Sequence, residues 1–230
     1  MENLTAHCLI KNEERFIWFA VMSVIHHVDK VMIWDTGSTD DTKQICLGLK
    51  KIHPDKIEFK EVGECDGMRH TELRNEMIKA TTTEWIMILD GDEIWPGKAL
   101  LEAKKMRETT NYIYSYFRLS FGNLFREARR KIDWKTCRFF KKVSAQWRGG
   151  FVRDGVYIEG EIKEGTLKER FIHTTHLNRS RIKTDYSSGG TRGSKEREGW
   201  FFSLFSKRIK DEDMPEIITY DGSCCTTFNL

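Results

Sequence analysis

Two patterns of apolar and polar positions alternate through the first 110 residues. Four short stretches rich in apolar residues are typical of buried strands, at 4–10, 31–34, 56–62 and 85–89. Between and after them, apolar residues recur every three to four positions, which predicts helices at 12–25, 38–52, 72–80 and 96–106. Strands that alternate with helices at this spacing predict an α/β fold with a mostly parallel, doubly wound sheet.

Polar residues near the predicted helix starts indicate caps. Asn12 is expected to cap the first helix, and Ser38 forms a capping-box-like pair with Asp41 at the second. Pro96 occupies a favoured first-turn position of the fourth helix. The periodicity assigns the following residues to the buried faces of the helices: Phe16, Ile17, Ala20, Val21, Val24, Ile25, Ile45, Leu49, Ile52, Leu73, Met77 and Ala80.

The pattern changes after about residue 111, where strands dominate. Strands are expected at 111–121, 136–140 and 156–162, with few helices between them. Residues 178–198 are basic and contain glycine, which predicts a loop, and the aromatic segment 200–205 runs into Lys207 and Arg208. Such a segment packs on the sheet or, if exposed, contacts an anionic membrane surface.

Composition narrows the class of protein. The chain has 230 residues, 39% hydrophobic and 12% aromatic, which favours one packed domain or a domain with a small appendage. Its six cysteines make no Cys-x-x-Cys pair or zinc-finger spacing, and the first residues do not form a secretory signal. Both features favour a cytoplasmic location. The net charge is only +3, but the second half is basic, which suits an anionic partner such as a phosphate, a lipid surface or nucleic acid.

Three acids follow the last buried strand of the first half. Asp90, Asp92 and Glu93 come directly after the apolar run that ends at Leu89. Because a strand interior cannot bury unpaired charges, the strand is expected to end at Leu89 with the acids at its carboxyl end. Ligands bind at this end in open α/β sheets, and two nearby carboxylates suit a divalent cation that bridges phosphates. The alternative is a solvated turn.

A further acid, Asp35, ends the second predicted strand and is followed by Thr36 and Gly37. Since the tips of parallel strands meet at one sheet edge, Asp35 is expected near Asp90 and Asp92, although a simple strand-turn-helix cap is the alternative. The chain has no Gly-x-Gly-x-x-Gly after the first strand and no Walker loop. A metal ion is therefore the expected means of neutralising a diphosphate.

Four segments together resemble glycosyltransferase family 2, which has the GT-A fold. The segments, in chain order, are Lys11-Asn12-Glu13-Glu14, residues 35–42, Arg74-Asn75 and residues 85–93. The resemblance implies a nucleotide-diphosphate sugar donor, Mn²⁺ or Mg²⁺, and sugar transfer with inversion at the anomeric carbon. It also implies a nucleotide-sugar-binding half at 1–110 and an acceptor-side half at 111–230, within one catalytic domain.

The resemblance assigns roles to individual residues. Asp35 would accept a hydrogen bond from the nucleobase, Asp90 would lie near the ribose and the metal-bound waters, and Asp92 would bind the metal directly. Arg74 would lie near the nucleotide, with Arg69 as the second candidate. It also places near the nucleotide Leu9, Lys11, Asn12, Glu14 and Gly91. Lys11 stands where many members have an aromatic residue, and Gly91 replaces a frequent alanine, which is expected to change little.

The second half resembles the family less closely. Arg138-Phe139-Phe140 is similar to an Arg-x-Phe segment of the family, and Arg153-Asp154 stands where a His-Glu pair is usual. Asp154 would be the general base that deprotonates the acceptor, with Glu159 and Glu161 as alternatives, and a turn residue is the structural interpretation of Asp154.

A histidine often completes the metal site in this family, and imidazole suits Mn²⁺. His176 is the first candidate and His173 the second. Because they lie three residues apart on a predicted strand, they would face opposite sides and only one would bind.

The resemblance favours a UDP-sugar as donor and a glycan or lipid-linked acceptor, in glycan or cell-envelope polysaccharide synthesis. Peripheral contact with the inner face of a membrane would suit a lipid-linked acceptor. Two other functions are weighed: a nucleotidyltransferase on a similar sheet, and a basic nucleic-acid-binding protein. The first lacks its glycine-rich basic signature and the second leaves Asp35, Asp90 and Asp92 without a role, so nucleic acid is not the expected partner.

Overall fold

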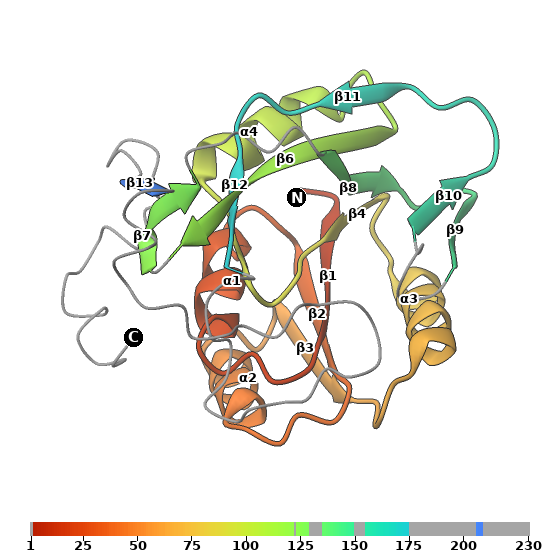
Figure 1. Cartoon of the computed structure of the whole chain (residues 1–230). Helices are drawn as coiled ribbons and strands as arrows, with labels where there is room; N and C mark the ends of the chain where they lie inside the picture. The colour runs from red at the N-terminus through yellow and green to blue at the C-terminus, as the bar shows by residue number, and fades with distance from the viewer. Residues whose placement is uncertain (1, 122, 129–134, 150–154, 175–205, 209–230) are drawn as a thin grey trace.

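Helices and strands alternate through the first half of the chain, as the sequence predicts (Figure 1). The computed structural model describes residues 2–121, 123–128, 135–149, 155–174 and 206–208. The elements of the first half are β1 (Leu4–Ile10), α1 (Ile17–Val24), β2 (Lys30–Asp35), α2 (Thr42–Ile52), β3 (Ile57–Glu61), α3 (Gly67–Ala80), β4 (Trp85–Ile88), β5 (Glu93–Ile94) and α4 (Gly97–Met106).

Strands make up the described second half. They are β6 (Tyr112–Phe121), β7 (Asn123–Ala128), β8 (Lys135–Lys141), β9 (Ala145–Arg148), β10 (Gly155–Ile158), β11 (Glu164–Thr166), β12 (Phe171–His173) and β13 (Ser206–Arg208). Among the described residues, the main sheet has the order β13-β7-β6-β8-β4-β1-β2-β3, and β9 and β10 form a separate hairpin. The sheet is therefore continuous across the boundary near residue 110.

The direction of the central strands positions the site. β1 pairs in parallel with β2 on one side and with β4 on the other, and β2 pairs in parallel with β3. The carboxyl ends of all these strands consequently lie at one edge of the sheet. β8 is antiparallel to β4, with Phe139 opposite Met87, so Arg138 reaches the same edge from the second half.

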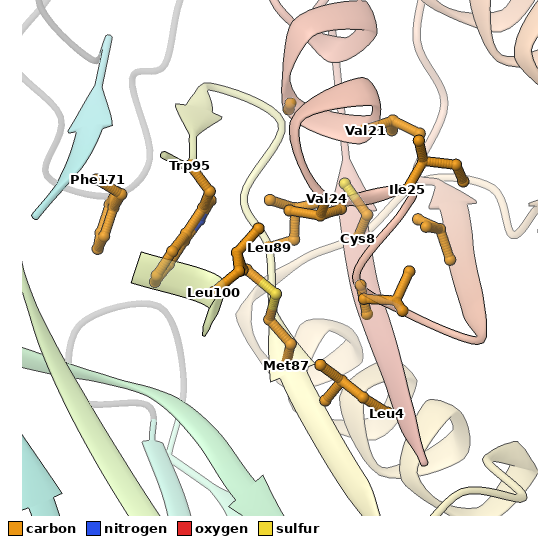
Figure 2. Packing of buried hydrophobic residues seen from close by; sticks show 14 of the residues in the cluster. Leu4, Cys8, Val21, Val24, Ile25, Met87, Leu89, Trp95, Leu100 and Phe171 are labelled. Carbon is orange, nitrogen blue, oxygen red and sulfur yellow. The ribbon is translucent and has the colours of Figure 1, made fainter. Parts of the chain in front are cut away.

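Helices cover both faces of the sheet. Figure 1 shows α1 and α2 on one side of β1, β2 and β3, with α3 on the other. The alternation of side chains along the strands explains the two layers, because Cys8, Val31 and Ile33 are buried in the cluster that contains α1, α2 and α4 residues. Figure 2 shows this packing around Val24, Leu89, Trp95 and Leu100. The opposite face buries Met32 and Trp34 against Leu73 and Met77 of α3.

The predicted helix starts differ from the observed ones. α1 begins at Ile17 and α2 at Thr42, and neither Asn12 nor Ser38 caps a helix. Both side chains are used elsewhere, in hydrogen bonds between the two loops that follow β1 and β2. α3 begins at Gly67, five residues earlier than expected, because the Asp66 carboxylate accepts a hydrogen bond from Arg69 N at 2.7 Å and caps the helix.

Two inward assignments at helix ends were wrong. Ile52 is 56% exposed, and the α2 positions buried in its place are Thr42 and Cys46, with Leu49 as expected. Ala80 is exposed at the end of α3, where Leu73 and Met77 are buried as expected.

Several strands of the second half were not expected. β10 ends at Ile158 and does not extend to 162, and the strands of this half absent from the prediction are β7, β9, β11 and β13, with β5 absent from that of the first half. These strands have two to six residues, so whether they form depends on the strands they pair with and not on their own sequences. The expected loop at 178–198 and the aromatic segment at 200–205 lie outside the described residues. In the part of the chain that is described, no helix has the length and apolar character needed to cross a membrane.

Candidate active site

The loops that follow β1 and β2 are joined by hydrogen bonds. Asn12 adopts a left-handed backbone conformation (φ 55°), and its Oδ1 accepts from Thr39 N at 2.8 Å. Asn12 N donates to Ser38 Oγ at 2.9 Å, and Glu14 Oε2 accepts from Asp41 N at 3.2 Å. Asn12 and Glu14 are both buried, so their side chains serve first to hold this loop pair together.

Asp35 lies at the end of β2, level with Ile10 of β1. Its Oδ1 accepts from Ser38 N at 2.7 Å, and the residue is 2% exposed. Leu9 is half-buried beside the cluster that contains Trp34. Since β1 separates β2 from β4, Asp35 and Asp90 flank the end of β1, about 10 Å apart by two strand spacings.

Two arginines hold Asp90 at the end of β4. Arg74 of α3 lies 3.4 Å from Asp90 Oδ1, and Arg138 of β8 lies 3.1 Å from Asp90 Oδ2. Both arginines are at least nine-tenths buried, whereas the side chain of Asp90 is 35% exposed. A carboxylate with one guanidinium on each oxygen has a fixed orientation before any ligand arrives.

Glu93 is the fully buried member of the acidic turn, the segment 90–93 between β4 and β5. Its Oε1 forms a very short contact with Arg138, and its Oε2 accepts from Trp95 Nε1 at 3.4 Å. Arg138 therefore bridges Asp90 and Glu93, while its guanidinium lies 5.3 Å from the ring of Phe171. Arg138 thus links the acidic turn to β8.

β12 brings a histidine to the acidic turn. His173 pairs with Glu93 in the antiparallel register of β12 and β5, and Thr174 N donates to Asp92 O at 2.9 Å. Asp92 is 2% exposed, and its Oδ2 lies 3.8 Å from His173 Nδ1. His173, the second candidate, therefore lies at the acidic turn, while His176 lies outside the described residues.

One ligand atom from each of Asp90, Glu93 and His173 lies within 4.8 Å of the others. Two carboxylates and one imidazole are a donor set that suits a divalent ion such as Mn²⁺. Asp92 adjoins this set through His173, and Glu93, which the sequence analysis left without a role, is part of it. The residues present therefore fit a divalent metal site.

Charge in the acidic turn is unevenly distributed. Burial alone would raise the pKa of Asp90, but Arg138 and Arg74 hold this pKa well below its usual range. Burial raises the pKa of Glu93 well above its usual range, because Asp90 and Asp92 add to the effect and Arg138 only partly opposes it. Arg138 and Arg74 consequently keep Asp90 ionised over the physiological range.

Other candidates lie away from the acidic turn. Lys11 forms an ion pair with Glu64, and Arg69 pairs with Glu72 and Glu76 along α3, so Arg74 and not Arg69 reaches Asp90.

The two alternative bases lie near the opposite edge of the sheet. The backbone carbonyl of Glu161 accepts a hydrogen bond from the side chain of Asn111. The backbone carbonyl of Asn111 accepts from Lys141 N, and Lys141 lies opposite Trp85 at the amino end of β4. Glu159 N donates a hydrogen bond to Ser144 O, at the end of the β9–β10 hairpin that lies toward the same edge of the sheet. This placement separates Glu159 and Glu161 from Asp90 by roughly the length of β4, about 13 Å. Asp154 lies outside the described residues.

Gly91 matters more than the sequence comparison with alanine suggested. A Cβ atom at Gly91 would lie 2.8 Å from Glu13 Cγ and 3.1 Å from Ile10 Cγ2. The acidic turn therefore packs directly on the loop after β1, and the expectation that glycine or alanine would serve equally here was wrong.

A cleft of about 530 Å³ opens beside the acidic turn, on the face of the sheet that carries α3. Asp90, Arg74 and Arg138 form its inner end, and aromatic residues of β6 and β9 line its walls. Gly155, the residue that follows Asp154 in the sequence, also lines it. Asp35, Asn12 and Lys11 are not among the residues that line the cleft.

Arg138 and Glu93 are the residues to which the sequence analysis gave no role. A signal was available, because Arg138 lies inside an apolar strand sequence, and an arginine buried there needs a carboxylate partner. The identity of that partner depends on strand order, which the sequence pattern did not provide.

Comparisons with known proteins agree with this architecture. The sequence profile described as "Glycosyl transferase family 2" matches residues 9–158, which is more than half of the chain. The chain belongs to glycosyl transferase family 2. A curated relative, a "TPR repeat-containing protein" of Synechococcus elongatus, is 30% identical over 95 residues, which are 40% of this chain and 21% of that protein. The match thus spans about a fifth of the relative.

Solved structures show the fold. The crystal structure of S. aureus TarS 1-349 has a TM-score of 0.55 and 13% identity, and the match covers 75% of this chain and 60% of that one. The mannosyltransferase PcManGT of Pyrobaculum calidifontis, in complex with GDP-Man and Mn²⁺, gives a TM-score of 0.43 at 20% identity, over 50% of this chain and 36% of that one. The expectation of a family 2 glycosyltransferase with the GT-A fold is confirmed.

Proposed function

We propose that this protein transfers a sugar from a nucleoside-diphosphate sugar to a hydroxyl group of an acceptor, with inversion at the anomeric carbon and with Mn²⁺ or Mg²⁺. The observation that carries this proposal is the convergence of Asp90, Glu93 and His173 at the carboxyl end of β4, next to Asp92. Carboxylates and imidazole at this edge of an α/β sheet suit a cation that holds a diphosphate. The family to which the chain belongs supports the same chemistry.

The residues of the site have different proposed roles. A divalent cation held by Asp90, Asp92, Glu93 and His173 would neutralise the charge that develops on the leaving diphosphate. Arg138 and Arg74 fix the orientation of Asp90, so little reorganisation is needed when the donor binds. Asp35 and the joined loops after β1 and β2 form the adjacent side, where the nucleoside is proposed to bind.

The transfer step needs a base on the acceptor side. The base takes the proton of the acceptor hydroxyl, its oxygen forms the new bond to the anomeric carbon, and the nucleoside diphosphate leaves with the electron pair of the broken bond. Asp154 is proposed for this role, supported by its place in the sequence directly before Gly155, which lines the cleft. A UDP-sugar donor, a glycan or lipid-linked acceptor, a role in cell-envelope polysaccharide synthesis and a cytoplasmic, membrane-peripheral location remain part of the proposal.

A panel of nucleotide sugars tests the donor. Thermal unfolding of the full chain is measured with UDP-, GDP-, dTDP- and ADP-sugars, with and without Mn²⁺. A donor at about 100 times its dissociation constant should raise the melting temperature by about 5 to 10 °C, because it binds the folded state alone. The proposal predicts that one class stabilises the protein and needs Mn²⁺ to do so. The absence of any shift across the panel would refute it.

Asp92→Asn tests the metal site directly. The variant should lower donor turnover at least about a hundredfold, since a ligand oxygen and its charge are lost from the metal site. Asp55→Asn is the matched control, because Asp55 is exposed near the start of β3, at the opposite edge of the sheet. Equal turnover in the two variants would contradict the assignment.

A further inference from the structure

The cleft beside the acidic turn has an aromatic lining from two elements. Tyr112 and Tyr114 come from β6, with ring centroids 5.0 Å apart, and Trp147 comes from β9. Tyr112 and Trp147 belong to one buried cluster with Ile88 and Val156, which fixes their rings. The faces of aromatic rings carry partial negative charge and attract the polarised C–H groups of a sugar ring. The volume of about 530 Å³ lies in the range of small-molecule sites.

The cleft also carries basic side chains at both ends. At the inner end, Arg74 and Arg138 are both paired with Asp90, and Arg138 is also paired with Glu93. Lys135 lines the outer end, with Nζ 4.1 Å from the centroid of the Tyr114 ring. Among the described residues, no carboxylate forms an ion pair with Lys135. Lys135 precedes Arg138 by three positions on β8, and the pairing of β8 with β6 is irregular between them, so both side chains line the cleft.

This arrangement leaves the donor side separate. The cleft contains none of the described residues of the loops after β1 and β2, and it reaches the acidic turn only at its inner end. A donor bound across the ends of β1 and β2 would present its anomeric carbon toward Asp90, and the second substrate would approach through the cleft. The inner end would then hold the reacting hydroxyl, the aromatic walls a sugar ring, and Lys135 a group beyond that ring.

We infer that the cleft binds the acceptor, and that this acceptor is an anionic saccharide whose phosphate or carboxylate group contacts Lys135 while its ring packs on Tyr112, Tyr114 and Trp147. The inference rests on the proposed transferase function and adds the chemical class of the acceptor. Phosphate and carboxylate share the chemistry that Lys135 recognises, so the test must separate them.

Saturation-transfer NMR titrations of the full chain provide the test. The probes are glucose, galactose and mannose, their 6-phosphates, and the corresponding uronates. At least one anionic probe should bind about tenfold more tightly than its neutral sugar, as one charge-assisted contact allows. A preference for 6-phosphates identifies a phosphate-bearing acceptor, and a preference for uronates identifies a carboxylate. Equal binding of neutral and anionic sugars would overturn the inference.

Two variants distinguish the contribution of the Lys135 charge to binding from that of the Tyr114 ring. Lys135→Gln should reduce anionic binding to the level of the neutral sugar, whereas Tyr114→Ala should weaken neutral and anionic probes alike. Lys141→Gln and Tyr157→Ala are the controls, because Lys141 pairs with Glu84 at the other end of β8 and Tyr157 is half-exposed outside the cleft. Anionic binding that survives Lys135→Gln would overturn the inference.

Failure of this inference differs from failure of the proposed function. The donor panel is measured on the same protein sample. If a nucleotide sugar and Mn²⁺ stabilise the chain while no anionic sugar is preferred, the transferase proposal stands and the acceptor assignment falls. If no nucleotide sugar binds, the transferase proposal falls, and the acceptor assignment falls with it.

Discussion

Arg138 is the residue on which the acidic turn depends most. Its guanidinium contacts Asp90 and the fully buried Glu93 and lies over the ring of Phe171. Removing it leaves the buried Glu93 without its Arg138 partner and leaves Asp90 with Arg74 alone, and losing one member of a buried ion-pair network is costly. The sequence placed Arg138 on a strand correctly, but its two partners depend on β8 lying next to β4.

Arg138→Gln should therefore lower the free energy of unfolding by about 3 kcal/mol. Arg138→Lys should lower it by less, because the charge is kept while one ammonium replaces the planar fork that reaches two carboxylates. Urea denaturation at pH 7.5 measures both. Arg148→Gln is the control, an exposed guanidinium over Tyr157, and a loss there as large as in Arg138→Gln would contradict the argument.

Gly91 gives a second prediction at the level of single atoms. Gly91→Ala should destabilise the protein by about 1 to 3 kcal/mol, because the new Cβ overlaps Glu13 Cγ at 2.8 Å. In a Glu13→Ala background the obstructing atom is absent, so the same substitution should cost less. A double-mutant cycle by urea denaturation measures this coupling, and strict additivity of the two changes would show that the contact does not restrict the turn.

At the scale of elements, the loop pair after β1 and β2 shows where sequence patterns succeed and fail. The strands β1, β2 and β4 were predicted from short apolar runs, because both of their faces are buried, and the helices were predicted from apolar periodicity, because one face of each is buried. The helix starts were predicted wrongly. Asn12 and Ser38 are residue types that cap helices, but here they form hydrogen bonds between the loops after β1 and β2. A capping residue does not reveal from its sequence which backbone N–H it satisfies.

Asn12 provides a test of the loop pair. Asn12→Ala should cost about 2 kcal/mol, since alanine is strained at φ 55° and Thr39 N loses its acceptor. Asn12→Gly tolerates the backbone conformation and loses only the hydrogen bond, so it should cost less. Guanidinium denaturation of both variants separates the cost of backbone strain from the cost of the lost hydrogen bond. A glycine variant less stable than the alanine variant would show that backbone strain is not a factor here.

The whole molecule is unified by one sheet that crosses from the first half of the chain to the second. β8 lies between β4 and β6, and β12 pairs with both β5 and β6. The sequence predicted the fold of the first half well, whereas the short strands of the second half carry little signal of their own. The same difference applies to the site: the acids were found from one segment, while Arg138 and His173 reach them only through the sheet.

Stability of the whole fold should depend on pH through His7, a buried histidine of β1. Its Nε2 lies 2.6 Å from Thr81 Oγ1, and burial, with the charges of Arg74 and Lys142, lowers the pKa of His7 from 6.5 to about 3. The unfolded chain then binds a proton that the folded chain excludes between these two values. The stabilisation is fully present above pH 6.5 and is lost progressively as the pH falls toward 3.

Between pH 7.5 and pH 5.0, the wild type should accordingly lose about 2 kcal/mol more than His7→Gln, which has no titrating group at this position. Urea denaturation at both values measures the difference. An equal loss in wild type and His7→Gln would mean that other groups produce the pH dependence.

The pairing of β5 with β12 has a consequence for biosynthesis of the protein. Glu93 and His173 are register partners although 80 positions separate them in the chain. A nascent polypeptide that has left the ribosome only as far as β4 and β5 carries the acids without Arg138 to balance them and without His173 to complete the ligand set. Under the proposed function, competence for metal and donor would therefore arise late, only after translation has passed β12, and truncated products would not consume nucleotide sugar.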